Sequence, residues 1–104
     1  MSTETVEQVV IDKQLKKDIQ PPSKYHVIFL NDNHTPMEFV TELLMIVFKH
    51  TQEAAENIMF QVHEDGKAIA GTYMYEIAEQ KTNEATHAAR QQGFPLGIHV
   101  EKAE

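Results

Sequence analysis

The sequence predicts an α+β fold: a small three-stranded antiparallel sheet packed against three helices, in the order β-α-α-β-α-β. Its 104 residues, 41% of them apolar, provide for one domain with one core. Short β-branched or aromatic segments alternate with longer segments of helical periodicity, and no βαβ unit is repeated, so we expect the helices on one side of the sheet. The expected strands are 25–30, 67–73 and 96–100, and the expected helices are 37–50, 51–65 and 76–92.

Residues 1–22 are predicted to form a flexible N-terminal tail, and residues 23–104 a core domain. The tail has no aromatic residue and one short apolar patch, residues 9–11, and Pro21 and Pro22 keep the chain after it extended. Four acidic and three basic residues before residue 23 give the tail a charge of −1 (4 − 3). The remaining −6 of the net charge of −7 therefore belongs to the core.

The first strand is predicted to lead through a polar loop into a capped helix. Asn31, Asp32 and Asn33 follow the strand, and such side chains bond their own backbone in turns. Thr35 is expected to cap the next helix, with Pro36 at its first position and Glu38 completing a capping box. This helix is apolar over most of its circumference, so we expect it to be the most buried one.

The other elements follow from local patterns. Thr51 is expected to cap the second helix, whose buried stripe would hold residues at i, i+3, i+4 and i+7, and Gly66 to end it. The next strand is short, and the third helix has alanines at helical spacing before Gly93. The members of the second helix's stripe are Ala55, Ile58, Met59 and Val62.

Composition excludes several classes of function. The net charge of −7 opposes a phosphate-binding surface, so we expect no nucleic acid partner. The absence of cysteine excludes disulfides and thiolate chemistry and fits a reducing compartment. No apolar run approaches the roughly 18 residues that cross a bilayer. The first twenty residues resemble neither a signal nor a transit peptide, so a soluble cytoplasmic protein is expected.

The sequence contains few residues or motifs that could form an enzyme's active site. Its only serines, Ser2 and Ser23, lie in or beside the tail, and it has no glycine-rich phosphate loop and no pair of histidines at a zinc helix's spacing. We therefore expect no catalytic residue, no cofactor and no resident metal. A metal site built from Asp32, His34 and His63 remains an alternative.

Three polar residues predict a different kind of site. Asn31 and Asp32 end the first strand, and His63 borders the apolar stripe of the second helix. They can serve as a turn and a helix-end residue and nothing more. Placed beside Met37 and Val40, however, they would form an apolar pocket with a polar, anionic rim. An ammonium donates three hydrogen bonds, and this rim supplies acceptors for them.

These residues lie within longer stretches that resemble the ATP-dependent Clp protease adaptor ClpS family. The resemblance covers essentially everything from residue 21 to the end, in the family's order and spacing. The stretches that carry it are Pro21 to Tyr25, Leu30 to Val40, Val62 to Ala68, Glu76, Lys81, Pro95-Leu96 and Glu101 to Ala103.

The resemblance implies a non-enzymatic adaptor that binds proteins by a free N-terminal Leu, Phe, Tyr or Trp and delivers them to the ClpA unfoldase of the ClpAP protease. It implies that Asn31, Asp32 and His63 hold the α-amino group, and that Met37 acts as a gatekeeper that crowds β-branched side chains. Glu76 and Lys81 would face the N-terminal domain of ClpA, and the tail would be threaded toward its channel. The side-chain pocket would be lined by Thr35, Met37, Val40, Met59, Val62 and Leu96.

The chain departs from the family's pattern at three positions. Asn33 stands where many members have an acid, His34 replaces an aromatic seen in some members, and Met74 stands where a hydroxyl would better cap the third helix. These departures bear on affinity and on the rank order of first residues. An alternative function is an inhibitor that docks on the unfoldase through Glu76 and Lys81 without recognising N-termini.

Overall fold

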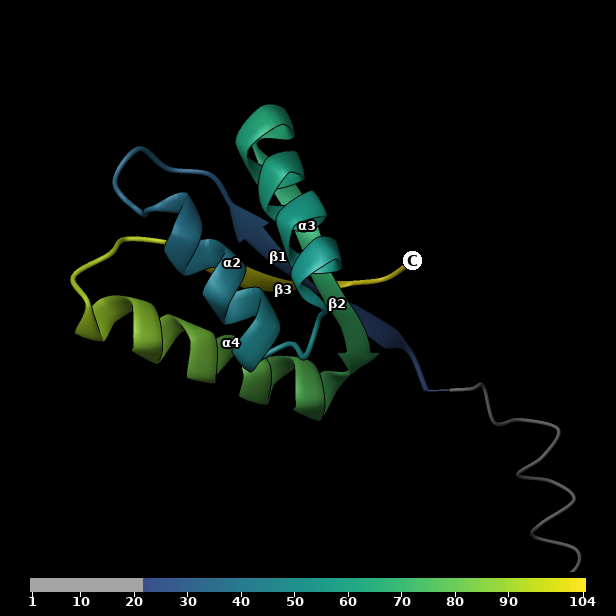
Figure 1. Ribbon diagram of the computed structural model, residues 1–104. Helices are drawn as coiled ribbons and strands as arrows, with labels where there is room; N and C mark the ends of the chain where they lie inside the picture. Colours follow the sequence, from purple (N-terminus) through teal and green to yellow (C-terminus); the bar gives the residue numbers. More distant parts are fainter. Residues whose placement is uncertain (1–21) are drawn as a thin grey trace, which may run out of the picture.

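The computed structural model describes residues 22–104, and its elements follow the predicted order (Figure 1). The fold prediction is confirmed. Residues 1–21 of the predicted tail lie outside the described residues. The elements are β1 (Lys24–Leu30), α2 (Met37–Ile46), α3 (Gln52–Asp65), β2 (Lys67–Met74), α4 (Tyr75–Gln91) and β3 (Gly97–Lys102).

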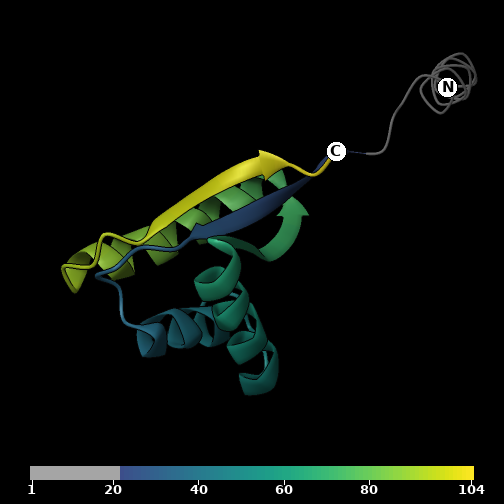
Figure 2. The same ribbon diagram turned by 90° about the horizontal axis from the view of Figure 1, so that it is seen from above.

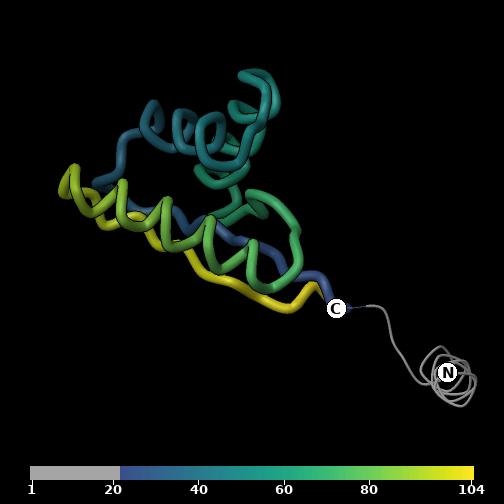
Figure 3. The backbone as a smooth tube through the Cα atoms, turned by 90° about the horizontal axis from the view of Figure 1, so that it is seen from below, coloured from purple at the N-terminus to yellow at the C-terminus, as the bar shows by residue number. Residues whose placement is uncertain are grey.

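The sheet has the order β2-β1-β3, and β1 pairs antiparallel with both neighbours. Helix α4 runs along the sheet, and α2 and α3 form a pair beside it (Figures 2 and 3). Val27 and Phe29 of β1 are fully buried, as expected for alternate residues on a core-facing side. They belong to one core cluster with Leu44 of α2, Val62 of α3 and Ala85 of α4.

The two predicted helix caps have different outcomes. The Thr51 cap is confirmed, because the Ala54 N–H donates to the Thr51 hydroxyl at 3.1 Å. The capping box at Thr35 is wrong: the N-cap is Pro36, which forms no side-chain cap bond. Thr35 instead donates its hydroxyl to the Asp32 carboxylate, at 2.8 Å. The hydroxyl that would have accepted a helix N–H is thus oriented as a donor to a charged acceptor, which makes a strong hydrogen bond.

Helix α2 ends four residues before the predicted end. Val47 and Phe48 are still buried, but Lys49 has a φ of 62°, in the left-handed region, and turns the chain. The His50 N–H then bonds the Leu44 carbonyl at 3.1 Å, and its ring bonds the Ala70 carbonyl of β2. The helix is also buried on one face only, since Ile46 is 62% exposed. Three of its ten residues are nevertheless buried, against three of fourteen in α3 and three of seventeen in α4, so the expectation that it is the most buried helix is confirmed.

The remaining boundaries shift by one or two residues. Gly66 ends α3 with a φ of 89°, as predicted. Met74 is the N-cap of α4 and makes no side-chain cap bond, which agrees with the expectation that a hydroxyl would serve better there. Strand β3 begins at Gly97 and continues to Lys102, so Leu96 lies just before the strand rather than in it. Leu96 is nevertheless 1% exposed, which places it in the core.

Candidate functional site

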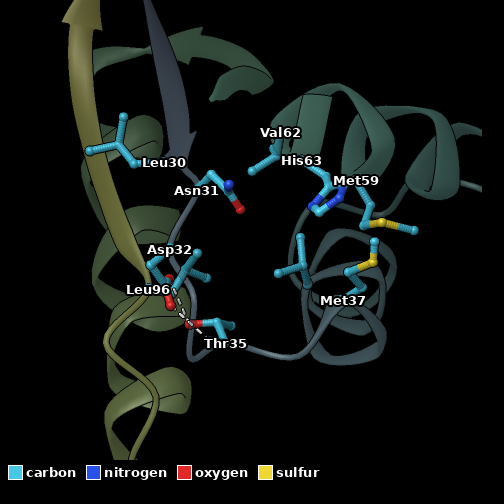
Figure 4. A pocket seen from close by; sticks show the side chains of 10 residues that line it. Leu30, Asn31, Asp32, Thr35, Met37, Met59, Val62, His63 and Leu96 are labelled. Atoms are coloured by element: carbon cyan, nitrogen blue, oxygen red, sulfur yellow. Dashed lines mark hydrogen bonds between the residues drawn. The ribbon is translucent and has the colours of Figure 1, made fainter. Parts of the chain in front are cut away.

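The predicted amine-binding and side-chain residues all line one pocket, where β1 ends and α2 begins (Figure 4). The loop after β1 forms one wall, α2 and α3 form another, and Leu96 closes the site from the segment before β3. Leu30 also lines the pocket and was missed by sequence reasoning. Its place depends on pairing with Gly97, about seventy residues away, whose added Cβ would lie 3.2 Å from the Leu30 Cδ1. No local pattern around Leu30 indicates that position.

Asp32 organises the loop. One of its carboxylate oxygens accepts the backbone N–H groups of His34 and Thr35, each at 2.7 Å, and the other accepts the Thr35 hydroxyl. Burial alone raises the pKa of Asp32, but these hydrogen bonds and the nearby His34 outweigh it and lower the pKa below its ordinary value of 3.8. Asp32 therefore carries a full negative charge at neutral pH. Three bonds leave about one of its roughly four lone-pair positions for a ligand.

Asn31, Asp32 and His63 form a polar rim around the mouth of the pocket. Asn31 is anchored by its backbone N–H, which donates to the Gly66 carbonyl at 2.9 Å, immediately after α3. This bond ties the end of β1 to the end of the helix that carries His63. Figure 4 shows the Asn31 amide and the His63 imidazole directed toward the same space from opposite sides. Both side chains are exposed, so a ligand can reach them from solvent.

The interior of the pocket is apolar and small. Val40, Met59, Val62 and Leu96 are buried in its walls, whereas Met37 is 38% exposed at the mouth. The unfilled space, including what opens to solvent, is about 260 Å³. The walls therefore leave only a small apolar space beneath the rim.

The alternative metal site does not form. Within residues 22–104, no three His, Asp or Glu side chains come close enough together to hold a metal ion. Asp32 instead bonds the backbone of its own loop. In the same part of the chain, no helix is both long and apolar enough to span a bilayer.

The two residues predicted to face an unfoldase lie on α4, away from the pocket. Glu76 is exposed in the first turn of α4, beside the start of β1, because Lys24 pairs with Met74. The seven residues of β1 separate it from the pocket by roughly 20 Å. Lys81 is partly buried: its ammonium donates to the Val47 carbonyl at 2.8 Å and lies 5.5 Å from the centre of the Tyr73 ring. Burial raises the pKa of Tyr73 above 10.0, so this ring stays neutral.

These contacts give Lys81 a structural role, because its charge meets a carbonyl at the C-terminal end of α2. We expect Lys81→Met, which keeps the aliphatic stem, to lower the free energy of unfolding by about 1 kcal/mol. Urea denaturation followed by circular dichroism measures the change. Lys102→Met, on an exposed residue of β3, is the matched control and should change stability by less than about 0.5 kcal/mol. Equal stability of both variants would contradict the role assigned to Lys81.

Together, the fold and the pocket describe a small binding module, and comparison with known proteins identifies its family. Residues 20–99 match the family described as ATP-dependent Clp protease adaptor protein ClpS. The ATP-dependent Clp protease adapter protein ClpS of Desulforapulum autotrophicum is 44% identical over 98 residues, which are 94% of this chain and 93% of the relative. That of Treponema denticola is 47% identical over 81 residues, 78% of this chain and 80% of the relative. The chain belongs to the ClpS family of Clp protease adaptors, which are not enzymes.

A solved structure carries the same fold. The chain is similar to Agrobacterium tumefaciens ClpS2 bound to L-phenylalaninamide, with a TM-score of 0.76 and 38% sequence identity. The similarity covers 79% of this chain and 99% of that one.

Proposed function

We propose that this adaptor binds proteins by a free N-terminal Leu, Phe, Tyr or Trp and delivers them to the N-terminal domain of a ClpA-type AAA+ unfoldase, for degradation by the ClpAP protease. The observation that carries the proposal is the pairing of a polar, anionic rim with a small apolar pocket whose walls are buried. L-Phenylalaninamide, the ligand of the Agrobacterium structure, has a free α-amine and a bulky apolar side chain. A protein's N-terminal residue presents the same two groups.

The rim can hold the α-ammonium group. This group donates three hydrogen bonds, and three acceptors surround the mouth: the Asn31 amide oxygen, a ring nitrogen of His63 and the free position on Asp32. The charge of Asp32 adds an electrostatic attraction. With the ammonium held at the rim, the side chain points between Val40 and Leu96. Burying a Leu or Phe side chain contributes about 1.5–3 kcal/mol.

Delivery requires that the substrate and the unfoldase bind at the same time. Glu76 lies at the far end of β1 from the pocket, so a partner docked around it leaves the mouth of the pocket open. Exposed Met74, Tyr75 and Ile77 surround Glu76 and offer an apolar contact area. Lys81 is held by Val47 and Tyr73, so we assign Glu76 the more direct part in docking.

Fluorescence anisotropy with labelled peptides tests the proposal. Peptides that begin with Leu, Phe, Tyr or Trp and carry a free N-terminus should bind with micromolar affinity, about −8 kcal/mol. Peptides that begin with Ala, and acetylated Leu peptides, should not bind, because acetylation removes the charge and the ammonium's donors. Binding of free and acetylated peptides with equal affinity would overturn the proposal.

The alternative, an inhibitor that docks on the unfoldase without recognising N-termini, predicts a different outcome. In that case no peptide binds, while the protein still associates with the N-terminal domain of ClpA. Glu76→Lys should then remove the association with ClpA and leave the pocket untouched.

A further inference from the structure

We propose that a second subsite beside the pocket selects a basic side chain, Arg or Lys, at the third residue of the bound N-terminus. The inference rests on the proposed function, because it requires the first residue to occupy the pocket. The subsite is a groove between α2 and α3, which we call the acidic groove. It is lined by Met37, Glu38, Thr41, Glu56, Met59 and Phe60.

The acidic groove is continuous with the pocket. Met37 and Met59 line both, so these two side chains form a shared wall. Figure 4 shows them side by side at the edge of the pocket, one from α2 and one from α3. A peptide whose first side chain fills the pocket can therefore pass over this wall into the groove.

Peptide geometry assigns the third residue. In an extended chain, side chains one and three point to the same side, about 7 Å apart, and side chain two points away. A spacing of about 7 Å between side chains one and three suits two adjacent sites, here the pocket and the acidic groove. The third side chain therefore reaches toward the groove, and the second faces solvent.

The groove has an apolar floor with acidic edges. Phe60 is 52% exposed although it is a large aromatic residue, and Glu56 lies one helical turn before it on the same face of α3. Glu38 approaches from the first turn of α2. An Arg or Lys can lay its aliphatic stem on Phe60 and Met59 and reach a carboxylate with its head.

The charge of the surroundings favours the same occupant. Among residues 22–104, no Lys or Arg lines either the pocket or the acidic groove, so no cation there neutralises Glu38 and Glu56. The Gln52 amide donates to the Glu56 carboxylate at 3.3 Å, which leaves its charge in place. An acidic residue at the third position would meet two like charges and, nearby, the ionised Asp32. We therefore expect the order of affinity Arg above Ala above Glu at this position.

Anisotropy with four peptides tests the subsite: free N-terminal Leu-Ala-Arg, Leu-Ala-Ala, Leu-Ala-Glu and Leu-Arg-Ala, each followed by the same neutral sequence. We expect Leu-Ala-Arg to bind about threefold to tenfold more tightly than Leu-Ala-Ala, and this advantage should shrink at high salt. The advantage of Leu-Arg-Ala over Leu-Ala-Ala should be smaller than that of Leu-Ala-Arg. An advantage for Arg at the second position as large as at the third would overturn the assignment.

Two variants connect the preference to the groove. Glu56→Gln and Phe60→Ala should each lower the advantage of Leu-Ala-Arg by about twofold to fivefold and leave the affinity for Leu-Ala-Ala unchanged. Glu84→Gln on α4 changes the net charge equally, and Ile46→Ala removes another exposed apolar side chain, from α2; both should keep the preference. Circular dichroism confirms that each variant is folded.

The possible failures are distinct. If Leu-Ala-Ala binds to the wild-type protein and the third residue makes no difference, the subsite is wrong and the proposed function stands. A preference for Arg that survives in both Glu56→Gln and Phe60→Ala also overturns the subsite. If no Leu peptide binds, the proposed function fails, and this inference fails with it.

Discussion

Asp32→Ala is expected to weaken the binding of a free N-terminal Leu peptide by at least about a hundredfold. The variant removes the negative charge opposite the α-ammonium, and hydrogen bonds to a charged group contribute about 1.5–3 kcal/mol. It also removes the acceptor of three hydrogen bonds that fix the loop carrying Asn31. The loss of the charge and the loss of the loop's hydrogen bonds both weaken the rim. Together they should reduce peptide affinity more than the substitution of any single wall residue. Peptide anisotropy measures the change.

Asp32→Asn separates the two contributions. Its amide oxygen can still accept the N–H groups of His34 and Thr35, so the loop should keep its shape while the charge is lost. We expect a loss of about tenfold, intermediate between wild type and Asp32→Ala. Gln61→Ala, on an exposed residue of α3 that does not line the pocket, is the control and should bind normally. Unchanged affinity in Asp32→Ala, with the protein folded by circular dichroism, would contradict a role for this carboxylate.

The elements that the sequence predicted correctly are those fixed by local contacts. The cap at Thr51 lies three residues from its donor, and the left-handed turn at Gly66 depends on that glycine alone. The Thr35 cap failed because its hydroxyl donates to Asp32 of the same loop and the N-cap is one residue later, at Pro36; local patterns do not indicate which partner the hydroxyl takes. The end of α2 was wrong because residues distant in the chain, Ala70 and Lys81, hold the segment that follows the helix.

The site residues also fall into two groups, those indicated by the local sequence and those that depend on contacts distant in the chain. Asn31, Asp32 and Met37 lie within seven residues, so the sequence alone indicated a polar loop leading into an apolar helix. Leu96 could be assigned only through the resemblance to the ClpS family, because no periodicity connects it to residues about sixty positions earlier. Leu30 was missed for the same reason, since it depends on the pairing of β1 with β3. The acidic groove requires the packing of α2 on α3, which no sequence pattern specifies.

Met37→Ala is expected to admit peptides that begin with Ile or Val, which the wild-type protein should bind weakly. Met37 is the exposed wall residue at the mouth, whereas Val40 and Leu96 are buried deeper. With the ammonium held at the rim as proposed, we expect the Cβ of the first residue to lie level with Met37, so that a branch at that carbon meets the thioether. Removing it should raise the affinity for Ile and Val peptides by about tenfold, equivalent to about 1.4 kcal/mol.

The affinity for Leu peptides should fall in the same variant, since Leu branches one carbon further out and loses an apolar contact with Met37. The ratio of Leu to Ile affinity, measured by anisotropy, is therefore more informative than either affinity alone. Met74→Ala removes a similarly exposed methionine at the other end of the sheet and should leave the ratio unchanged. If Ile and Val peptides gain nothing in Met37→Ala while Leu peptides lose affinity, Met37 contributes contact area but does not select against branching, and the selection must come from the buried walls.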